Sequence, residues 1–108
     1  MKPPRLETYV FALVGAVCRG YDAREAVIRR GAKQEEDRAL LASCLWLNDL
    51  VDRSLDVCPD EQTRAQIKRA LCGGLGYDAV GVPLSGKNQF YRKKNDVRRE
   101  IAKRLHLI

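Results

Sequence analysis

The side chains that could do chemistry in this sequence are cationic and amide groups gathered at its C-terminal end. From Ser85 to Ile108 the chain carries eight Lys and Arg against two acidic residues, whereas residues 1–84 carry twelve of each. The whole formal charge of +6 therefore lies in this last segment. Lys and Arg neutralise phosphates, and amide side chains can read base edges in a major groove. A neutral body with one cationic segment is typical of a protein that binds a polyanion.

The apolar residues of the same segment predict the element that presents these groups. An apolar stripe recurs at steps of seven, four, four and three, formed by Phe90, Val97, Ile101, Leu105 and Ile108. That spacing predicts one amphipathic helix over residues 85–107, with Phe90 anchoring it to the body. Ser85 is expected at the N-cap, where its hydroxyl can accept from a free backbone N–H.

The predicted helix changes character along its length. Its first turns carry side chains that can reach base edges, with Lys87 suited to guanine and Asn88 or Gln89 suited to adenine. Its later turns carry point charges suited to phosphates. The predicted nucleic-acid-binding residues are Lys87, Asn88, Gln89, Tyr91, Arg92, Lys93, Arg98, Arg99 and Lys103. Two other interpretations stay open, a solvated helix whose charges only keep the protein soluble and a helix that contacts a membrane or an acidic protein surface.

Metal and redox chemistry are not expected. The four cysteines, Cys18, Cys44, Cys58 and Cys72, form no C-x-x-C pair, and the one histidine, His106, stands far from them in the sequence. A zinc site would therefore lack its usual paired ligands. Each cysteine lies in or beside an apolar helical pattern, which favours reduced, buried thiols.

No catalytic set is apparent in the sequence. Asp49 and Asp52 stand three residues apart, but no nucleophile–base pair accompanies them, so we interpret them as part of a solvated helix face. Gly74-Leu-Gly76 lacks the strand and the third glycine of a nucleotide-binding fingerprint. We therefore expect a protein with no enzymatic activity, no cofactor and no metal.

The N-terminal stretch has only part of the pattern of a signal peptide. Lys2 and Arg5 precede the apolar run 9–18, but Glu7 interrupts the basic flank, and Val17 stands where a small residue should precede a cleavage site. No run approaches the roughly 18–20 apolar residues of a membrane span. These features predict a cytoplasmic protein with no membrane partner.

Other periodic segments predict the helices that must position the basic one. We expect a helix over 6–19 ended by Gly20, a short helix between an Asp22–Glu25 capping box and Gly31, and helices over 34–56 and 59–72. The inward stripes are expected to include Leu6 and Leu13 in the first helix and Leu40 in the third. The helix over 34–56 has so wide an apolar side that it is either the central core helix or a dimer seam, and we favour the core helix.

The C-terminal elements together predict a helix-turn-helix. The helix over 59–72 is followed by a short helix over 77–82, a turn at Pro83-Leu84 and the basic helix, which takes the place of the recognition helix. We expect an all-α, single-domain bundle of five to six helices over residues 1–108, with N-terminal helices in 1–58 and the helix-turn-helix part in 59–108.

The stretch 82–108, through Ser85, Phe90-Tyr91 and Ala102-Lys-Arg-Leu105, resembles the C-termini of small prophage-encoded, sigma-factor-like helix-turn-helix transcription regulators of Gram-positive bacteria. The resemblance covers about a quarter of the chain. It implies a small DNA-binding transcription regulator of phage or mobile-element type that binds duplex DNA, with RNA polymerase or another host nucleoprotein as a further candidate partner. Two alternatives stay open: a phage interaction protein that inhibits a host nucleoprotein complex, such as a CRISPR effector or RNA polymerase, and a DNA-packaging adaptor. A homodimer is a further candidate assembly.

Overall fold

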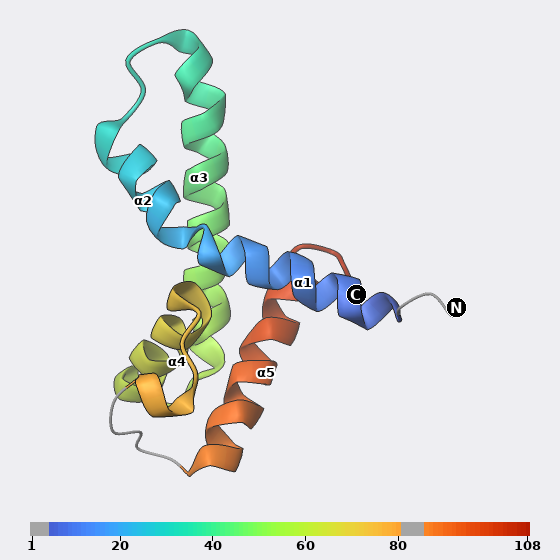
Figure 1. Ribbon diagram of the computed structural model, residues 1–108. Coiled ribbons are helices and arrows are strands. Elements are labelled where there is room, and N and C mark those ends of the chain that lie inside the picture. Colours follow the sequence, from blue (N-terminus) through green and yellow to red (C-terminus); the bar gives the residue numbers. More distant parts are fainter. Residues whose placement is uncertain (1–4, 81–85) are drawn as a thin grey trace.

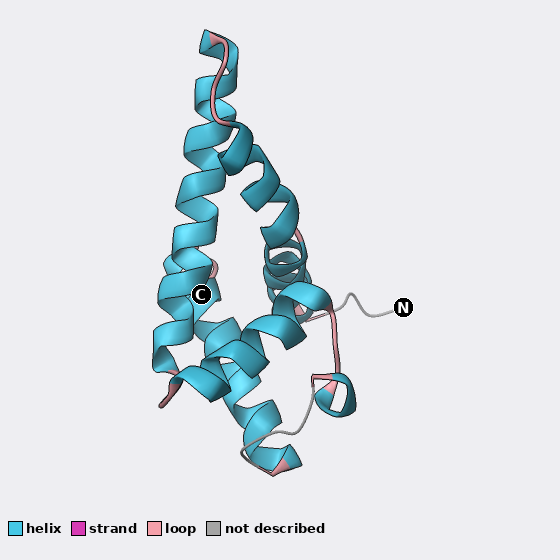
Figure 2. Cartoon of the chain, turned by 90° about the vertical axis from the view of Figure 1, so that its left-hand side faces the viewer, coloured by secondary structure: helices cyan, strands magenta, loops and turns pink. Residues whose placement is uncertain are grey.

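The computed structural model describes residues 5–80 and 86–108, and every regular element in this part of the chain is a helix (Figures 1 and 2). The α-helices are α1 (Leu6–Arg19), α2 (Tyr21–Arg30), α3 (Glu35–Ser54), α4 (Glu61–Gly73) and α5 (Lys87–Arg104). Two 3-10 turns accompany them, η1 (Leu55–Val57) directly after α3 and η2 (Tyr77–Ala79) after α4. The prediction of an all-α fold is confirmed for these residues.

A helix-turn-helix is not seen in the described residues. The short helix predicted over 77–82 is a single 3-10 turn that ends at Ala79. The predicted turn at Pro83-Leu84 and the predicted N-cap Ser85 lie outside the described residues. The basic helix begins at Lys87, with Gly86 as its N-cap residue, and ends at Arg104 rather than at residue 107.

The helices are arranged around α3, the longest of them (Figure 1). Helix α2 runs back along the first half of α3 and forms a hairpin with it, while α5 packs against the other half. Helix α4 contacts η1 at the end of α3 and packs against α1 and α5. Helix α1 crosses between these two parts and contacts α2, α4 and α5. The molecule measures 47 × 41 × 21 Å, and its radius of gyration of 15.2 Å exceeds the roughly 13 Å expected for a compact chain of this length. The fold is therefore flat and open.

Local signals fix several of the helix ends. Asp60 is the N-cap of α4 and its carboxylate accepts from the backbone N–H of Thr63 at 2.7 Å, so the helix begins after Pro59 rather than at it. Gly31 and Gly74 follow α2 and α4 with φ of 70° and 66°, backbone angles that favour glycine.

The predicted capping box at Asp22 and Glu25 is wrong. Helix α2 begins at Tyr21, directly after Gly20, and has no side-chain cap, so Asp22 already lies in its first turn. Gly20 alone joins α1 to α2 and, as predicted, ends α1.

One core joins all five helices. It contains Val14 and Cys18 from α1, Val51 from α3, Ile67 from α4, and the predicted stripe residues Phe90, Val97 and Ile101 from α5, all at most 1 % exposed. Helix α2 joins it through Tyr21, which is 7 % exposed. Leu105 is half-buried against this core, but Ile108 is 65 % exposed because the chain leaves the helix after Arg104, and His106 takes a φ of 58°.

Two predicted inward faces are only partly covered. Cys44, Leu50 and Val51 bury one side of α3, as expected for a core helix, but Leu40 is 54 % exposed. In α1, Leu6 and Leu13 were expected inside and are instead open to solvent, at 72 % and 52 % exposure. The core of this small protein uses one side of each helix and leaves apolar side chains uncovered on α1.

Candidate nucleic-acid interface

Helix α5 is held to the body by one side and presents the other to solvent. Its buried residues are Phe90, Val97, Ile101 and Ala102, and they pack against α1, α3 and α4. The Phe90 ring meets the edge of Tyr77 at 5.4 Å and that of Tyr91 at 5.3 Å between ring centroids, which fixes the first turns of the helix. The predicted anchoring role of Phe90 is confirmed.

The solvent side of α5 carries an exposed polar stripe. The stripe is formed by Asn88, Arg92, Asn95, Arg99 and Lys103, all exposed, at steps of four, three, four and four. Because a helix turns by about 100° per residue, this spacing places the stripe opposite the buried residues. We refer to these five residues as the polar stripe of α5.

The cations of the polar stripe are not used to stabilise the fold. Within residues 5–80 and 86–108, no ion pair involves Arg92, Arg99 or Lys103, nor Lys87 at the start of the helix. Their charges therefore remain available to an anionic partner.

The remaining predicted residues lie outside the polar stripe. Gln89 is exposed, and Tyr91 is 38 % exposed with its hydroxyl near Gly76. Lys93 is half-buried and its Nζ lies 3.4 Å from the Asp96 carboxylate, so its charge is partly compensated. Arg98 is also half-buried and donates to the Asn95 side-chain oxygen at 3.1 Å. Arg98 and Arg99, predicted to act alike, are thus placed in different surroundings.

Lys94 is a residue of this surface that the sequence-based site left out. Its ammonium lies 5.8 Å from the centre of the Tyr91 ring, and burial together with the neighbouring Arg98 charge lowers the pKa of Lys94. The residues three and four positions away on both sides, at 90, 91, 97 and 98, include no acid, which was a readable signal of an uncompensated cation. An anion placed between Lys94 and Arg98 would relieve their repulsion.

The start of α5 also differs from the other helix starts. The first turns of α1, α2, α3 and α4 all contain an acidic residue, whereas the first turn of α5 contains none and begins with Lys87. Gly86 supplies no side-chain cap. The positive end of this helix dipole is therefore reinforced by charge instead of being neutralised, which suits contact with phosphate.

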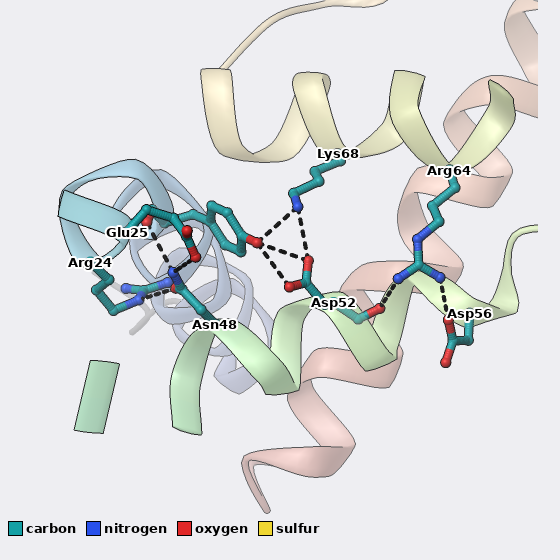
Figure 3. Close-up of polar contacts among 8 residues, drawn as sticks. Arg24, Glu25, Asn48, Asp52, Asp56, Arg64 and Lys68 are labelled. Carbon is teal, nitrogen blue, oxygen red and sulfur yellow. Dashed lines mark hydrogen bonds and ion pairs between the residues drawn. The ribbon is translucent and has the colours of Figure 1, made fainter. Parts of the chain in front are cut away.

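A second polar cluster joins α2, α3 and α4 (Figure 3). The Tyr21 hydroxyl donates to the Asp52 carboxylate at 2.8 Å, and Lys68 Nζ lies 2.8 Å from that hydroxyl and 2.9 Å from Asp52 Oδ1. The Lys68 ammonium also lies 4.2 Å from the centre of the Tyr21 ring. Asp52 was predicted to lie on a solvated face, and its side chain is 37 % exposed, but it also makes these contacts between helices, which the sequence did not predict. Asp49, whose side chain is 59 % exposed and pairs with Arg53 at 2.8 Å, does lie on such a face.

This cluster stabilises the packing of the helices and is not a reactive site. Burial lowers the pKa of Lys68, but hydrogen bonds with Tyr21 and Asp52 outweigh burial and raise it, so the ammonium stays charged. Next to it, the Asn48 amide donates to Glu25 at 2.9 Å and accepts from Arg24 Nε at 2.6 Å. Every polar group has a charged or hydrogen-bonding partner, as expected for a network that holds helices together.

The cysteines are unpaired thiols. Cys18 and Cys44 are buried, and Cys58 and Cys72 are half-buried. Burial raises the pKa of Cys72 to about 12, so this thiol stays protonated and unreactive.

No group of three His, Cys, Asp or Glu in the described part of the chain is arranged to hold a metal ion. Within the same residues, none of the helices combines the length and the apolar character needed to cross a membrane.

The resemblance to prophage regulators has no counterpart in the comparisons with known proteins. No protein-family model, no curated protein and no solved structure matches this chain.

Proposed function

We propose that this protein is a small DNA-binding transcription regulator of phage or mobile-element type, which reads duplex DNA with α5. The observation that carries the proposal is the polar stripe of α5: three cations and two amides face solvent along one helix, opposite its core residues and without ion pairs among the described residues. An α-helix with such a face fits the width of a major groove. Residues 1–84 have no formal net charge, so the field of the protein is directed by α5.

The proposed docking divides α5 into two parts. The first turns, with Asn88 and Arg92 on the polar stripe and Lys87 and Gln89 beside them, meet base edges. The later turns, with Arg99 and Lys103, contact phosphates. In this proposal α4, η2 and α5 act as a helix-turn-helix with α5 as the recognition helix. The edge contact between the rings of Tyr77 and Phe90 holds α5 at its angle.

The test is the salt dependence of binding to duplex DNA. Binding is measured by fluorescence anisotropy with labelled duplexes of random and selected sequence. The variant Arg92→Gln plus Arg99→Gln removes two cations from the polar stripe. The control, Arg29→Gln plus Arg38→Gln, removes the same charge from exposed positions on the α2–α3 hairpin. We expect the stripe variant to weaken binding by at least about tenfold and to reduce the slope of log K against log salt by about 1.8, because two phosphate contacts are lost.

The control variant should bind almost as well as the wild type. If the two variants weaken binding equally, the protein attracts DNA through its overall charge, and the assignment of α5 is wrong. An inhibitor of a host nucleoprotein complex would leave free duplex unbound at every salt concentration, and that result would also overturn the proposal.

A further inference from the structure

A pocket lies between α3 and the C-terminal end of α5. Its volume is about 320 Å³, at the lower end of the range for small-ligand sites. It belongs neither to the polar stripe of α5 nor to the cluster around Lys68. The residues that line it are Trp46, Asp49, Leu50 and Arg53 of α3, with Arg104 of α5 and His106 just after it.

The only tryptophan of the chain lines this pocket and is largely uncovered. Trp46 is 56 % exposed, so most of its indole takes no part in the core. Leu50, one turn further along α3, is 6 % exposed and belongs to the core, so the helix that carries the indole is held in place. A flat aromatic ring on a fixed helix is the kind of group on which a nucleobase stacks.

Two guanidinium groups of the pocket keep donors for an anion. Arg53 pairs with Asp49 through Nε at 2.8 Å, and Arg104 pairs with Glu100 through Nε at 3.3 Å. Within the described residues these contacts leave the Nη atoms of both arginines without a hydrogen bond, and most of the N–H donors of a guanidinium are on Nη. Exposed ion pairs of this kind are weak, so a phosphate can compete with the carboxylates for the same arginines.

The turn after α5 brings His106 into the pocket lining. The backbone N–H groups of His106 and Leu107 donate to the carbonyls of Lys103 and Ala102, at 3.0 and 2.9 Å. These bonds hold His106 at a φ of 58°, in a region that residues with a side chain rarely adopt. They also occupy carbonyls at the negative end of the helix dipole, which would otherwise repel an anion.

We infer that this pocket binds one unpaired nucleotide of a nucleic-acid strand, with the base stacked on the Trp46 indole and the phosphate held by Arg53 and Arg104. His106 supplies a hydrogen-bonding group for the base or the sugar. A strand fits better than a free nucleotide because Arg104 directly follows Lys103, the last cation of the polar stripe, so the next phosphates can continue along α5. This single-strand site goes beyond the proposed reading of duplex DNA and does not require it.

Other ligands would use only part of the pocket. An apolar ligand would cover Arg53 and Arg104 without giving them a partner, which costs free energy. A simple anion would use the arginines but leave the indole exposed, and a cation stacked on the indole would be repelled by both arginines. A nucleotide combines the aromatic face and the phosphate that these side chains require.

The experiment uses the full chain and an oligothymidylate of about eight nucleotides, within the site sizes of single-strand-binding folds. Because Trp46 is the only tryptophan, its fluorescence reports on the pocket directly. Thymidine monophosphate, an abasic oligonucleotide of the same length and a random-sequence duplex are titrated in the same way. We expect the oligothymidylate to quench the fluorescence by stacking and the abasic oligonucleotide to leave it almost unchanged.

Variants separate stacking from charge, with affinities measured by the anisotropy of a labelled oligothymidylate. Trp46→Leu should weaken binding by about 5- to 150-fold, the effect of losing one base–aromatic stack, and Trp46→Phe should weaken it less. Arg53→Gln should reduce the slope of log K against log salt by about 0.7, because one phosphate contact to a single strand is lost. The control Arg38→Gln removes an exposed, acid-paired arginine of the same helix outside the pocket and should leave the slope unchanged. Circular dichroism establishes that all variants keep the helical fold.

Equal affinity for the abasic and thymidine oligonucleotides, or an unchanged affinity in Trp46→Leu, would overturn the nucleotide site. If thymidine monophosphate binds as tightly as the oligothymidylate, the pocket takes a free nucleotide and its place on a strand is wrong. Quenching by the oligothymidylate in a protein that binds no duplex supports the pocket and overturns the DNA proposal. Salt-dependent binding to duplex without quenching by the single strand leaves the DNA proposal standing and overturns the pocket.

Discussion

Replacing Phe90 by alanine tests whether the first turns of α5 are held by the core or only by helix propensity. The Phe90 side chain is 1 % exposed and lies edge-on to both Tyr77 and Tyr91. Removing a buried phenylalanine costs about 3–5 kcal/mol, because the transfer free energy is lost and a cavity remains. At about 2.1 cal/mol/K per residue, the unfolding entropy of this 108-residue chain converts that cost into a fall in Tm of roughly 13–22 °C.

The matched control is Tyr91→Ala, which removes the neighbouring ring of the same aromatic cluster. Tyr91 is 38 % exposed, so its loss should cost about 1 kcal/mol and lower the Tm by roughly 4–5 °C. Thermal unfolding followed by circular dichroism measures both changes. Hydrogen exchange of the amides in 87–93 should quicken in Phe90→Ala relative to those of α3. Equal Tm shifts in the two variants would refute the reasoning, because they would mean that burial of Phe90 does not fix α5.

Three further changes test the remaining parts of the structure. Asp52→Ala should lower the free energy of unfolding by about 1–3 kcal/mol, because Tyr21 and Lys68 lose their acceptor in a half-buried network. The surface variant Asp49→Ala should lower it by less than about 0.5 kcal/mol. Both are measured by urea unfolding, and equal losses would contradict the stabilising role of the network. The free energy of unfolding should fall as the pH rises from about 9 toward 12, because the Cys72 thiol has a pKa of 9.0 in the unfolded chain and about 12 in the folded one. In Cys72→Ala the free energy of unfolding should fall less steeply with pH. If the fall is as steep as in the wild type, ionisation of Cys72 does not cause it. Lys87→Ala plus Gln89→Ala should weaken binding to the selected duplex more than binding to a random duplex, so the specificity ratio falls. If the anisotropy assay shows an equal loss of affinity for both duplexes, these residues contact phosphates instead of bases.

The helical fold and the orientation of α5 could be predicted from the sequence because both depend on local periodicity. Phe90, Val97 and Ile101 mark the buried side, and rotation by 100° per residue then places Arg92 and Arg99 on the opposite side. The same rotation separates Arg98 from Arg99, a distinction that the predicted site did not draw and that the sequence contained.

Tertiary contacts decided what periodicity could not. Asp52 reads as a surface residue because its partners, Tyr21 and Lys68, stand 31 and 16 residues away in the sequence. The start of α2 was misplaced for a related reason, since Tyr21 is drawn into the helix and buried by that same network instead of preceding an Asp22 cap. The open side of α1 could not be read either, because an apolar pattern does not state which of its sides will find a neighbour.

The separation of α5 into two opposite sides has a consequence for how the chain can change. Substitutions at Asn88, Arg92, Asn95, Arg99 and Lys103 alter the outer surface without removing a core contact or an ion pair of the described body. Such positions can drift in a population at little thermodynamic penalty, so the preference of the surface for one ligand over another can be rewritten while the scaffold persists. A library randomised at these five codons would therefore sample binding phenotypes with few members lost to misfolding.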